Sequence, residues 1–408
     1  MTTAERLFTR VGHILNDQEF PRLTAGLTAA VRLTVGDRSL NIKFEDQCAT
    51  IQQEVDDIRV SVKASEGAWE ILLQSPPPPT FHSFTALQLV NNEFEISGDP
   101  LWVARCRPAL ERLIERLVDS PVRSHPTPAR NIEQIVAGYR TVRTEESEFD
   151  LYVEHAGQGI PVLFLHTAGA DSRQFLGQMA DIEMAQSYSM WAVDMPFHGK
   201  SLPPLCWNGA TYTLTSTRYL SWCVAMLEQV IKTKAIIVGG SMGAAMTMML
   251  AAKRPDLVAG IVAVEPPFRS TGRRNPFQHH AEIHGAMHNA SFVRGLMSPE
   301  SPEANRRRAA WIYSQGAPGV YGGDLAFYSD EFDGAVIGPQ IDTTKTPVTL
   351  LSGTYDYSAT PEDGQKLQSV ITGSTLEIME GLGHFPMCEH PDLFRPHLLK
   401  ALERIWGG

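Results

Sequence analysis

The stretch AIIVGGSMGAAMTMML, residues 235–250, decides the fold of the longer part of the chain. Its first four residues are apolar, as in a buried strand, and its last residues suit a helix. A serine on a sharp turn between a strand and a helix is crowded, so small residues are needed two positions before it and two after it. Gly239 and Gly243 hold those positions around Ser241. Because the N-terminus of the following helix favours negative charge, we predict that Ser241 is a nucleophile on a nucleophile elbow rather than part of a structural turn.

Two later residues are suited to activate Ser241. A serine hydroxyl is a poor nucleophile unless a base removes its proton and a third group orients that base. His384 follows the last expected strand in a glycine-containing loop, and Asp356 follows the strand before it. Side chains at the carboxyl ends of parallel strands meet at one edge of a sheet. We therefore predict that His384 is the base and Asp356 the orienting acid.

From residue 136 on, short apolar runs alternate with longer helical stretches. Strands that are apolar on both faces are typical of a mostly parallel sheet covered by helices on each side, which predicts an α/β fold. After a hairpin at 139–143 and 149–155, the expected strands are 161–165, 191–193, 235–238, 259–264, 348–352 and 375–379. The expected helices are 173–186, 215–233, 243–253, 361–370 and 390–406.

These motifs, in this order, resemble the α/β-hydrolase family over residues 136–408. The resemblance implies a catalytic triad of Ser241, His384 and Asp356. The competing acid is Glu265, which follows the preceding strand at a position that some family members use. The resemblance also implies an oxyanion hole with one backbone amide from Met242 and a second from the loop after the third strand. Most family members have His-Gly in that loop, whereas this chain has His166-Thr167, so the amide of Thr167 or of Ala168 is the expected second donor.

Residues 266–342 form a stretch too long for a simple crossover, and family members insert a helical cap domain at about this place. Aromatic side chains above a catalytic serine form apolar pockets, which predicts that Trp311, Tyr313 and Phe327 bind substrate. The alternative is that they form only the core of the cap. His280, His284 and His288 recur every four residues and would share one helix face. The glutamate order of a zinc-protease motif is missing, so we expect neither a metal nor a cofactor.

The first 120 residues have a different pattern. Apolar stretches at 29–35, 40–44, 49–54 and 58–62 predict antiparallel strands, flanked by helices at 5–15 and 102–117. The order of these pieces, with Trp69 opening a helix and Gly98-Asp99 preceding the last one, resembles the sterol-carrier-protein fold. That resemblance implies a smaller α+β domain that binds an apolar ligand, and the alternative is a structural or dimerisation module. Residues 121–135, rich in proline, are the expected linker.

Composition limits the partners and the compartment. The chain of 408 residues has 35 Lys and Arg against 46 Asp and Glu, a net charge of −11, which argues against binding nucleic acid. Five scattered cysteines, the absence of a signal-peptide pattern, and no apolar run of about 20 residues predict a cytoplasmic protein with no disulfide framework and no membrane segment. A homo-oligomer through the N-terminal domain is the expected protein partner.

Together these features predict a serine esterase. It would cleave a small to medium, apolar carboxylic ester or lactone through an acyl-enzyme. One alternative is a hydrolase that uses the same triad to cleave a carbon–carbon bond in a diketone-like substrate. An alternative of another class is a ligand-binding receptor on a hydrolase scaffold.

Overall fold

The computed structural model describes residues 1–407, which form two compact units. Unit 1 comprises Met1–Val122 together with Pro276–Pro302, and unit 2 comprises Arg123–Asn275 together with the rest of the chain from Glu303. Each unit has its own sheet and its own core.

Unit 1 is built on a five-stranded sheet with the order β3-β2-β1-β4-β5. Its strands are β1 (Ala29–Val35), β2 (Arg38–Glu45), β3 (Cys48–Gln52), β4 (Ile58–Ala64) and β5 (Phe94–Gly98). All neighbouring pairs are antiparallel except β1 and β4, which run parallel. The alternate residues Val31, Leu33 and Val35 of β1 are fully buried, as expected for a sheet with one face against a core.

Helices cover the buried face of this sheet. They are α1 (Thr3–Ile14), α2 (Phe20–Leu23), α3 (Glu66–Leu72), α4 (Phe84–Leu89) and α5 (Pro100–Leu117). The long helix α5 begins at Pro100, two residues before the expected start at 102, because the Asp99 side chain accepts a hydrogen bond from the amide of Leu101 and Pro100 occupies the first helical position.

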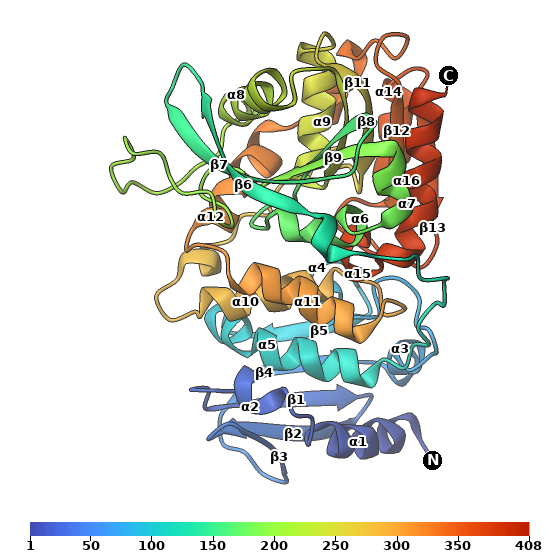
Figure 1. Ribbon diagram of the computed structural model, residues 1–408. Coiled ribbons are helices and arrows are strands. Elements are labelled where there is room, and N and C mark those ends of the chain that lie inside the picture. The colour runs from blue at the N-terminus through green and yellow to red at the C-terminus, as the bar shows by residue number, and fades with distance from the viewer. Residues whose placement is uncertain (408) are drawn as a thin grey trace. The chain divides into compact units, whose positions relative to one another are not determined.

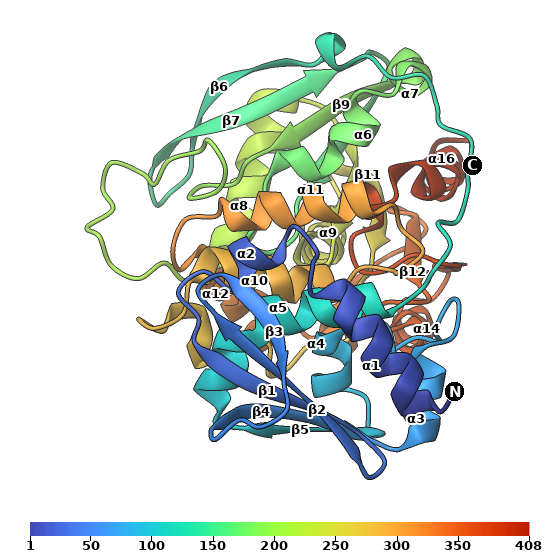
Figure 2. The same cartoon turned by 90° about the horizontal axis from the view of Figure 1, so that it is seen from below.

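Residues 276–302 pack with unit 1, although the sequence predicts one cap over 266–342 in the hydrolase part. This segment holds η4 (Pro276–His279) and α10 (Gly285–Gly295), and α10 lies alongside α5 (Figure 2). Phe292 of α10 stacks under the guanidinium of Arg107 of α5, 5.4 Å from ring centroid to charge. Gly295 contacts α4 so closely that an added Cβ would lie 2.8 Å from the side chain of Thr85.

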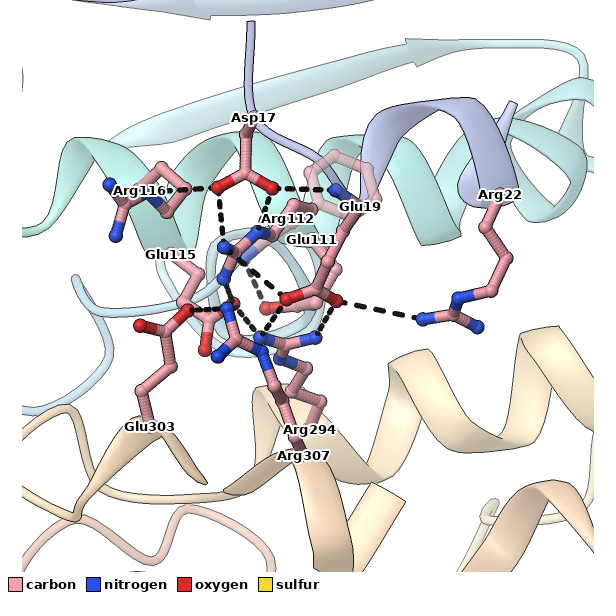
Figure 3. A network of polar contacts seen from close by, with 11 residues as sticks. Asp17, Glu19, Arg22, Glu111, Arg112, Glu115, Arg116, Arg294, Glu303 and Arg307 are labelled. Carbon is pink, nitrogen blue, oxygen red and sulfur yellow. Dashed lines mark hydrogen bonds and ion pairs between the residues drawn. The ribbon is translucent and has the colours of Figure 1, made fainter. Parts of the chain in front are cut away.

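Ion pairs with little exposure to solvent connect α10 to the rest of unit 1 (Figure 3). Arg294, 8% exposed, pairs with Glu19 at 2.6 Å and with Glu115 at 2.7 Å. Arg112 of α5 pairs with Glu115 at 2.8 Å and with Asp17 at 2.5 Å. Each of these charges therefore has an opposite charge beside it, as burial requires.

The histidines expected on one helix face do not share one. Helix α10 begins only at Gly285, so His280 and His284 precede it and only His288 lies on it. The backbone before the helix instead turns, with the amide of Ile283 donating to the carbonyl of His280 at 3.0 Å. Among residues 1–407, no three His, Cys, Asp or Glu side chains are placed to hold a metal ion.

Unit 2 contains an eight-stranded sheet with the order β13-β12-β11-β10-β8-β9-β7-β6. The strands are β6 (Val136–Arg143), β7 (Glu148–Ala156), β8 (Ile160–Leu165), β9 (Tyr188–Val193), β10 (Ala235–Gly240), β11 (Val258–Val264), β12 (Val348–Gly353) and β13 (Thr375–Met379). The six strands from β13 to β9 are parallel, and β7 and β6 are antiparallel additions at one edge. The α/β fold class predicted from the sequence is confirmed, and a smaller sheet domain precedes it.

Helices cover both faces of the large sheet (Figure 1), with α8 and α9 on one face and α6, α7 and α16 on the other. The helical elements up to β11 are η1 (Ile132–Gln134), η2 (Ser172–Phe175), α6 (Leu176–Met179), α7 (Ile182–Ser187), α8 (Ser216–Ala225), the π-helical turn η3 (Met226–Ile231) and α9 (Met242–Lys253). Those after residue 302 are α11 (Glu303–Ser314), α12 (Val320–Leu325), the π-helical turn η5 (Ala326–Glu331), α13 (Gly334–Ile337), η6 (Gly338–Gln340), α14 (Pro361–Val370), α15 (Pro386–Glu389) and α16 (Pro391–Trp406).

The single helix expected over 173–186 is broken into η2, α6 and α7. The break has a local cause, since Asp181 caps a new helix by accepting a hydrogen bond from the amide of Met184 at 2.9 Å. Within residues 1–407, no helix is both long enough and apolar enough to cross a bilayer.

Candidate active site

Ser241 occupies the strained turn between β10 and α9. Its backbone has φ 51° and ψ −108°, a conformation that L residues seldom adopt. The two flanking glycines are required by close packing. A Cβ on Gly239 would lie 2.3 Å from the carbonyl carbon of Gly243, and one on Gly243 would lie 2.4 Å from the carbonyl oxygen of Leu165.

The structure brings Ser241, His384 and Asp356 together. The Oγ of Ser241 lies 2.9 Å from Nε2 of His384, and Nδ1 of His384 lies 2.6 Å from Oδ2 of Asp356. The other carboxylate oxygen of Asp356 accepts hydrogen bonds from the amides of Ser358 at 2.7 Å and Ala359 at 3.1 Å. This arrangement places a proton on Nδ1 and leaves Nε2 free to accept the serine proton.

Glu265 lies at the end of β11 and is fully buried, but its hydrogen bond goes elsewhere. Its Oε2 accepts the amide of Gly353 at 2.9 Å, so Asp356 is the carboxylate bonded to His384. Burial first, and then the neighbouring charge of Asp356, raise the pKa of Glu265 well above its usual value. Glu265 is therefore favoured in its neutral form.

The loop that carries His384 is fixed from two sides. The amide of Gly383 donates a hydrogen bond to the carboxylate of the buried Glu389 in α15. The amide of Gly381, at φ 79°, donates to Oγ1 of Thr354 at 3.0 Å. The position of the imidazole is thus set by backbone contacts as well as by Asp356.

The sequence offered the amides of Thr167 and Ala168 as the second oxyanion donor, and one of them already donates a hydrogen bond within the chain. The amide of Thr167 donates to Oε1 of Gln174 at 2.9 Å, and within residues 1–407 no group accepts a hydrogen bond from the amide of Ala168. The Met242 amide is the first of α9 and no side chain caps it. Within residues 1–407, the amides of Met242 and Ala168 therefore have no hydrogen-bond acceptor, whereas the amide of Thr167 has one.

Thr167, Gln174 and Tyr313 form a closed set of hydrogen bonds, which we call the Thr167 cluster. Nε2 of Gln174 donates to Oγ1 of Thr167 at 3.0 Å and to the hydroxyl of Tyr313 at 3.2 Å, and the two hydroxyls also contact each other. All three side chains are buried. The hydroxyl of Thr167, where most family members have glycine, thus connects the oxyanion loop to α11.

Asp324 of α12 holds the other end of the same loop. Its fully buried carboxylate accepts the amide of Gly169 at 2.7 Å, Nε2 of His198 at 2.8 Å and the hydroxyl of Tyr212 at 2.9 Å. Burial lowers the pKa of His198, but the charge and hydrogen bond of Asp324 outweigh it and raise that pKa. Gln174 and Asp324 were not predicted from the sequence, because neither lies in a motif and their partners are far away in the chain.

The three residues expected to bind substrate lie in different surroundings. Trp311 is 61% exposed and lines a cleft of about 550 Å³. Tyr313 is buried in the Thr167 cluster. Phe327 is fully buried and packs edge-on against Tyr219 and Phe332, so it belongs to the core of unit 2 rather than to a pocket wall.

Comparison with known proteins agrees with the fold of unit 2. The family model described as alpha/beta hydrolase fold matches residues 160–391. An uncharacterised protein of Mycobacterium tuberculosis is 25% identical over 290 residues, which cover 65% of this chain and 81% of that protein. A thermophilic esterase from Thermogutta terrifontis is similar at TM-score 0.57 and 18% identity, covering 66% of this chain and 99% of the esterase. An enol-lactonase from Burkholderia xenovorans is similar at TM-score 0.55 and 18% identity, covering 65% and 99%.

The two solved structures support the fold at these low identities, and the family model matches more than half of the chain. The chain therefore belongs to the alpha/beta hydrolase fold family.

Proposed function

We propose that this protein is a serine hydrolase that cleaves a small to medium carboxylic ester or lactone through an acyl-enzyme. The observation that carries the proposal is the continuous hydrogen-bonded path from Ser241 through His384 to Asp356, with distances of 2.9 and 2.6 Å. The names of the two similar structures, an esterase and an enol-lactonase, support this class of substrate.

Acylation follows from the arrangement of the three side chains. Nε2 of His384 takes the proton of Ser241 as Oγ attacks the substrate carbonyl carbon, and Asp356 stabilises the imidazolium that forms. The amides of Met242 and Ala168 donate to the oxyanion. His384 then gives its proton to the leaving oxygen as the carbon–oxygen bond breaks, which leaves an ester on Ser241.

Deacylation repeats these steps with water as the nucleophile. His384 takes a proton from the water as it attacks the acyl carbon, and returns a proton to Oγ of Ser241 when the acid leaves. The reaction needs no group beyond the chain and water. Cleavage of a carbon–carbon bond in a diketone-like substrate by the same triad is the second candidate, and a non-catalytic receptor is disfavoured because the triad is complete.

A fluorophosphonate that reacts with activated serines tests the proposal. We expect covalent labelling at Ser241 in the full chain, and loss of labelling in Ser241→Ala and His384→Ala. Ser221→Ala, which removes a serine on α8 that hydrogen-bonds only within its helix, serves as the matched control and should be labelled as the wild type is. A folded wild-type protein that is not labelled would exclude the mechanism.

The choice between ester and carbon–carbon cleavage needs a second measurement. We expect hydrolysis of 4-nitrophenyl esters of short to medium chain length to be faster than cleavage of a vinylogous diketone. The reverse order would favour the carbon–carbon hydrolase.

A further inference from the structure

The cleft lined by Trp311 has no role in the steps above. It has a volume of about 550 Å³ and lies among α11, η2, α6 and α15, all of which belong to unit 2. Clefts of about 300–1,000 Å³ are of the size that holds small organic molecules. Of the residues among 1–407 that line it, none is Ser241, His384 or Asp356. The cleft is therefore a candidate for a second binding site.

Part of the lining is apolar. Leu176, Ile312 and Met387 line the cleft together with Trp311, which is 61% exposed. An indole is a large apolar surface, and leaving it in water forgoes the free energy that its burial would give. A ligand with an apolar body would cover it.

The charged side chains of the lining are mostly positive. They are Arg130, Arg173 and Arg308, with Asp392 as the carboxylate among them. Arg130 pairs with Asp392 at 2.5 Å, and Arg173 pairs with Asp171 at 2.5 Å. Within the described residues 1–407, the guanidinium of Arg308 has no carboxylate as a partner. The cleft thus holds an unmatched positive charge, in a chain whose net charge is −11.

Arg308 and Trp311 are neighbours on the surface of α11. Residues three positions apart in a helix have Cβ atoms about 5–6 Å from each other. Both side chains line the same cleft. An anionic group that pairs with Arg308 would therefore place the apolar body attached to it on the indole of Trp311.

Two buried side chains border both the cleft and the catalytic loops. Gln174 lines the cleft, and its Oε1 accepts the amide of Thr167 in the oxyanion loop at 2.9 Å. Met387 lines the cleft and packs on the residue before Ser241, since a Cβ on Gly240 would lie 2.5 Å from its methyl carbon. We therefore expect a ligand in the cleft to lie beside these supports and to leave the oxygen of Ser241 accessible.

We propose that this cleft binds an amphipathic carboxylate, with its charged group on Arg308 and its apolar body on Trp311, at a site separate from Ser241. A guanidinium matches the geometry of a carboxylate and forms charge-assisted hydrogen bonds with it. Trp311, expected from the sequence to bind substrate, then contacts this second ligand instead. Binding here does not depend on hydrolysis, so the inference goes beyond the proposed function.

A carboxylate and its neutral amide test the charge preference. Isothermal titration calorimetry of the full chain should show one 6-phenylhexanoate bound per chain. The amide of the same acid keeps the apolar body and should bind at least about 3-fold more weakly. Absence of carboxylate binding, or equal Kd values for the acid and the amide, would overturn the inference.

Arg308→Gln should raise Kd of 6-phenylhexanoate about 3- to 10-fold, as for a charge-assisted contact that is partly exposed, and leave Kd of the amide unchanged. Arg143→Gln is the matched control, because it removes an exposed arginine of β6 that pairs with Glu148 at 2.7 Å outside the cleft. It should change neither value. Equal losses for the acid and the amide in Arg308→Gln would show that the charge of Arg308 is not recognised.

Trp311→Ala should weaken binding of both the acid and the amide by about 10-fold, because both use the apolar surface. Trp406→Ala removes a tryptophan of similar exposure, 56%, outside the cleft and should leave both Kd values unchanged. Melting temperatures of all four variants check that they are folded. Equal effects of the two tryptophan substitutions would place the ligand elsewhere and contradict the inference.

Labelling of Ser241 tests whether the two sites are separate. Protein that carries the fluorophosphonate should bind 6-phenylhexanoate with a Kd within about 3-fold of the unlabelled value, and the acid should not slow labelling. Loss of binding after labelling would overturn the inference, because the ligand would then occupy the active site. Wild-type protein that is not labelled would refute the proposed function, whereas the Arg308 and Trp311 variants would still decide this inference.

Discussion

At the scale of single residues, the distinction between Asp356 and Glu265 depends on which of them holds a charge. Both follow neighbouring parallel strands, and both were candidates from their positions in the sequence. The structure separates them by their hydrogen bonds, since Asp356 is bonded to His384 and Glu265 to the amide of Gly353. A neutral amide can replace a neutral acid at little cost, but it cannot replace an orienting carboxylate.

We therefore predict opposite outcomes for two similar substitutions. Glu265→Gln should leave kcat/KM of the hydrolase reaction within about 3-fold of the wild type, because the amide oxygen still accepts the Gly353 amide. Asp356→Asn should lower kcat by about 10⁴-fold, the loss typical when the orienting acid of such a triad is neutralised. Steady-state rates on a 4-nitrophenyl ester decide the matter, and a larger loss in the first variant would make Glu265 the acid.

The stability of Glu265→Gln and that of the wild type should depend differently on pH. The folded-state pKa of Glu265 is raised, so the native state holds the proton more tightly than the unfolded chain. The stabilisation that this gives is full below the unfolded pKa of about 4.3 and is lost as pH rises through the raised value. Glu265→Gln cannot ionise beside Asp356 and Glu389, so its free energy of unfolding relative to wild type should improve between pH 5 and pH 8.5. Urea unfolding at both values measures this, and a constant difference would contradict it.

At the scale of elements, the oxyanion loop is held by parts of the chain that lie far beyond it. The Thr167 cluster connects the loop to α11, and Asp324 connects it to α12. At the position where most family members have glycine, this chain has Thr167, whose side chain contacts Gln174 and Tyr313. In the proposed mechanism, in which the amide of Ala168 donates to the oxyanion, Gln174 and Tyr313 are therefore positioning residues.

Tyr313→Phe should lower kcat by about 10-fold with little change in KM, because a displaced oxyanion donor affects the transition state more than the ground state. The affinity for a boronic acid that mimics the tetrahedral intermediate should fall in parallel. Tyr139→Phe, which removes an exposed hydroxyl on β6, is the control. A lower melting temperature with unchanged kcat would show that the cluster serves stability alone.

The ion pairs of α10 carry a second prediction at this scale. Arg294→Ala should lower the free energy of unfolding by about 3–5 kcal/mol, because it removes this partner from the buried Glu115 and from Glu19, whose side chain is only 14% exposed. Arg22→Ala removes an exposed arginine that reaches the same Glu19 at 3.5 Å, and should cost no more than about 1 kcal/mol. Chemical unfolding of both variants provides the comparison, and equal losses would contradict the role of burial.

The strands and the nucleophile turn were predictable from the sequence because their signals are local. A four-residue apolar run before Gly239 and a capped start at Asp99 each determine an element by neighbouring residues. The features that could not be predicted from the sequence are those in which a side chain contacts residues distant in the chain. No periodicity shows that Phe327 enters the core or that the histidines at 280 and 284 precede α10. The catalytic roles of Ser241, His384 and Asp356 stay predictions until labelling tests them.

At the scale of the whole molecule, the division into units does not follow the order of the chain. The proline-rich linker at 121–135 marks one boundary, but unit 1 also takes residues 276–302 from within the hydrolase part. The resemblance of unit 1 to the sterol-carrier-protein fold, and a homo-oligomer formed through it, stay predictions. Sedimentation of the full chain tests the second.

Cutting the chain at the linker should therefore give a fragment that folds poorly. A fragment of residues 123–408 retains α10 without α5, and exposes the buried Val293 and Arg294. We expect it to be largely insoluble or to bind a hydrophobic dye. A variant of the fragment in which a short Gly-Ser linker replaces 276–302 should recover soluble protein, although its activity is a separate question. A soluble, dye-free fragment 123–408 would show that α10 does not need unit 1.

The interrupted course of unit 1 also determines when it can fold in the cell. Residues 1–122 leave the ribosome before α10 (Gly285–Gly295), which follows some 170 residues later. At synthesis rates of roughly 5–20 residues per second, the face of α5 that α10 covers waits roughly 10–40 s for its partner. During that time a buried layer of arginines and carboxylates is open to solvent and to other nascent chains. Unit 1 is thus completed only after most of unit 2 has been made, and its yield should depend on chaperones that shield segments made before their partners.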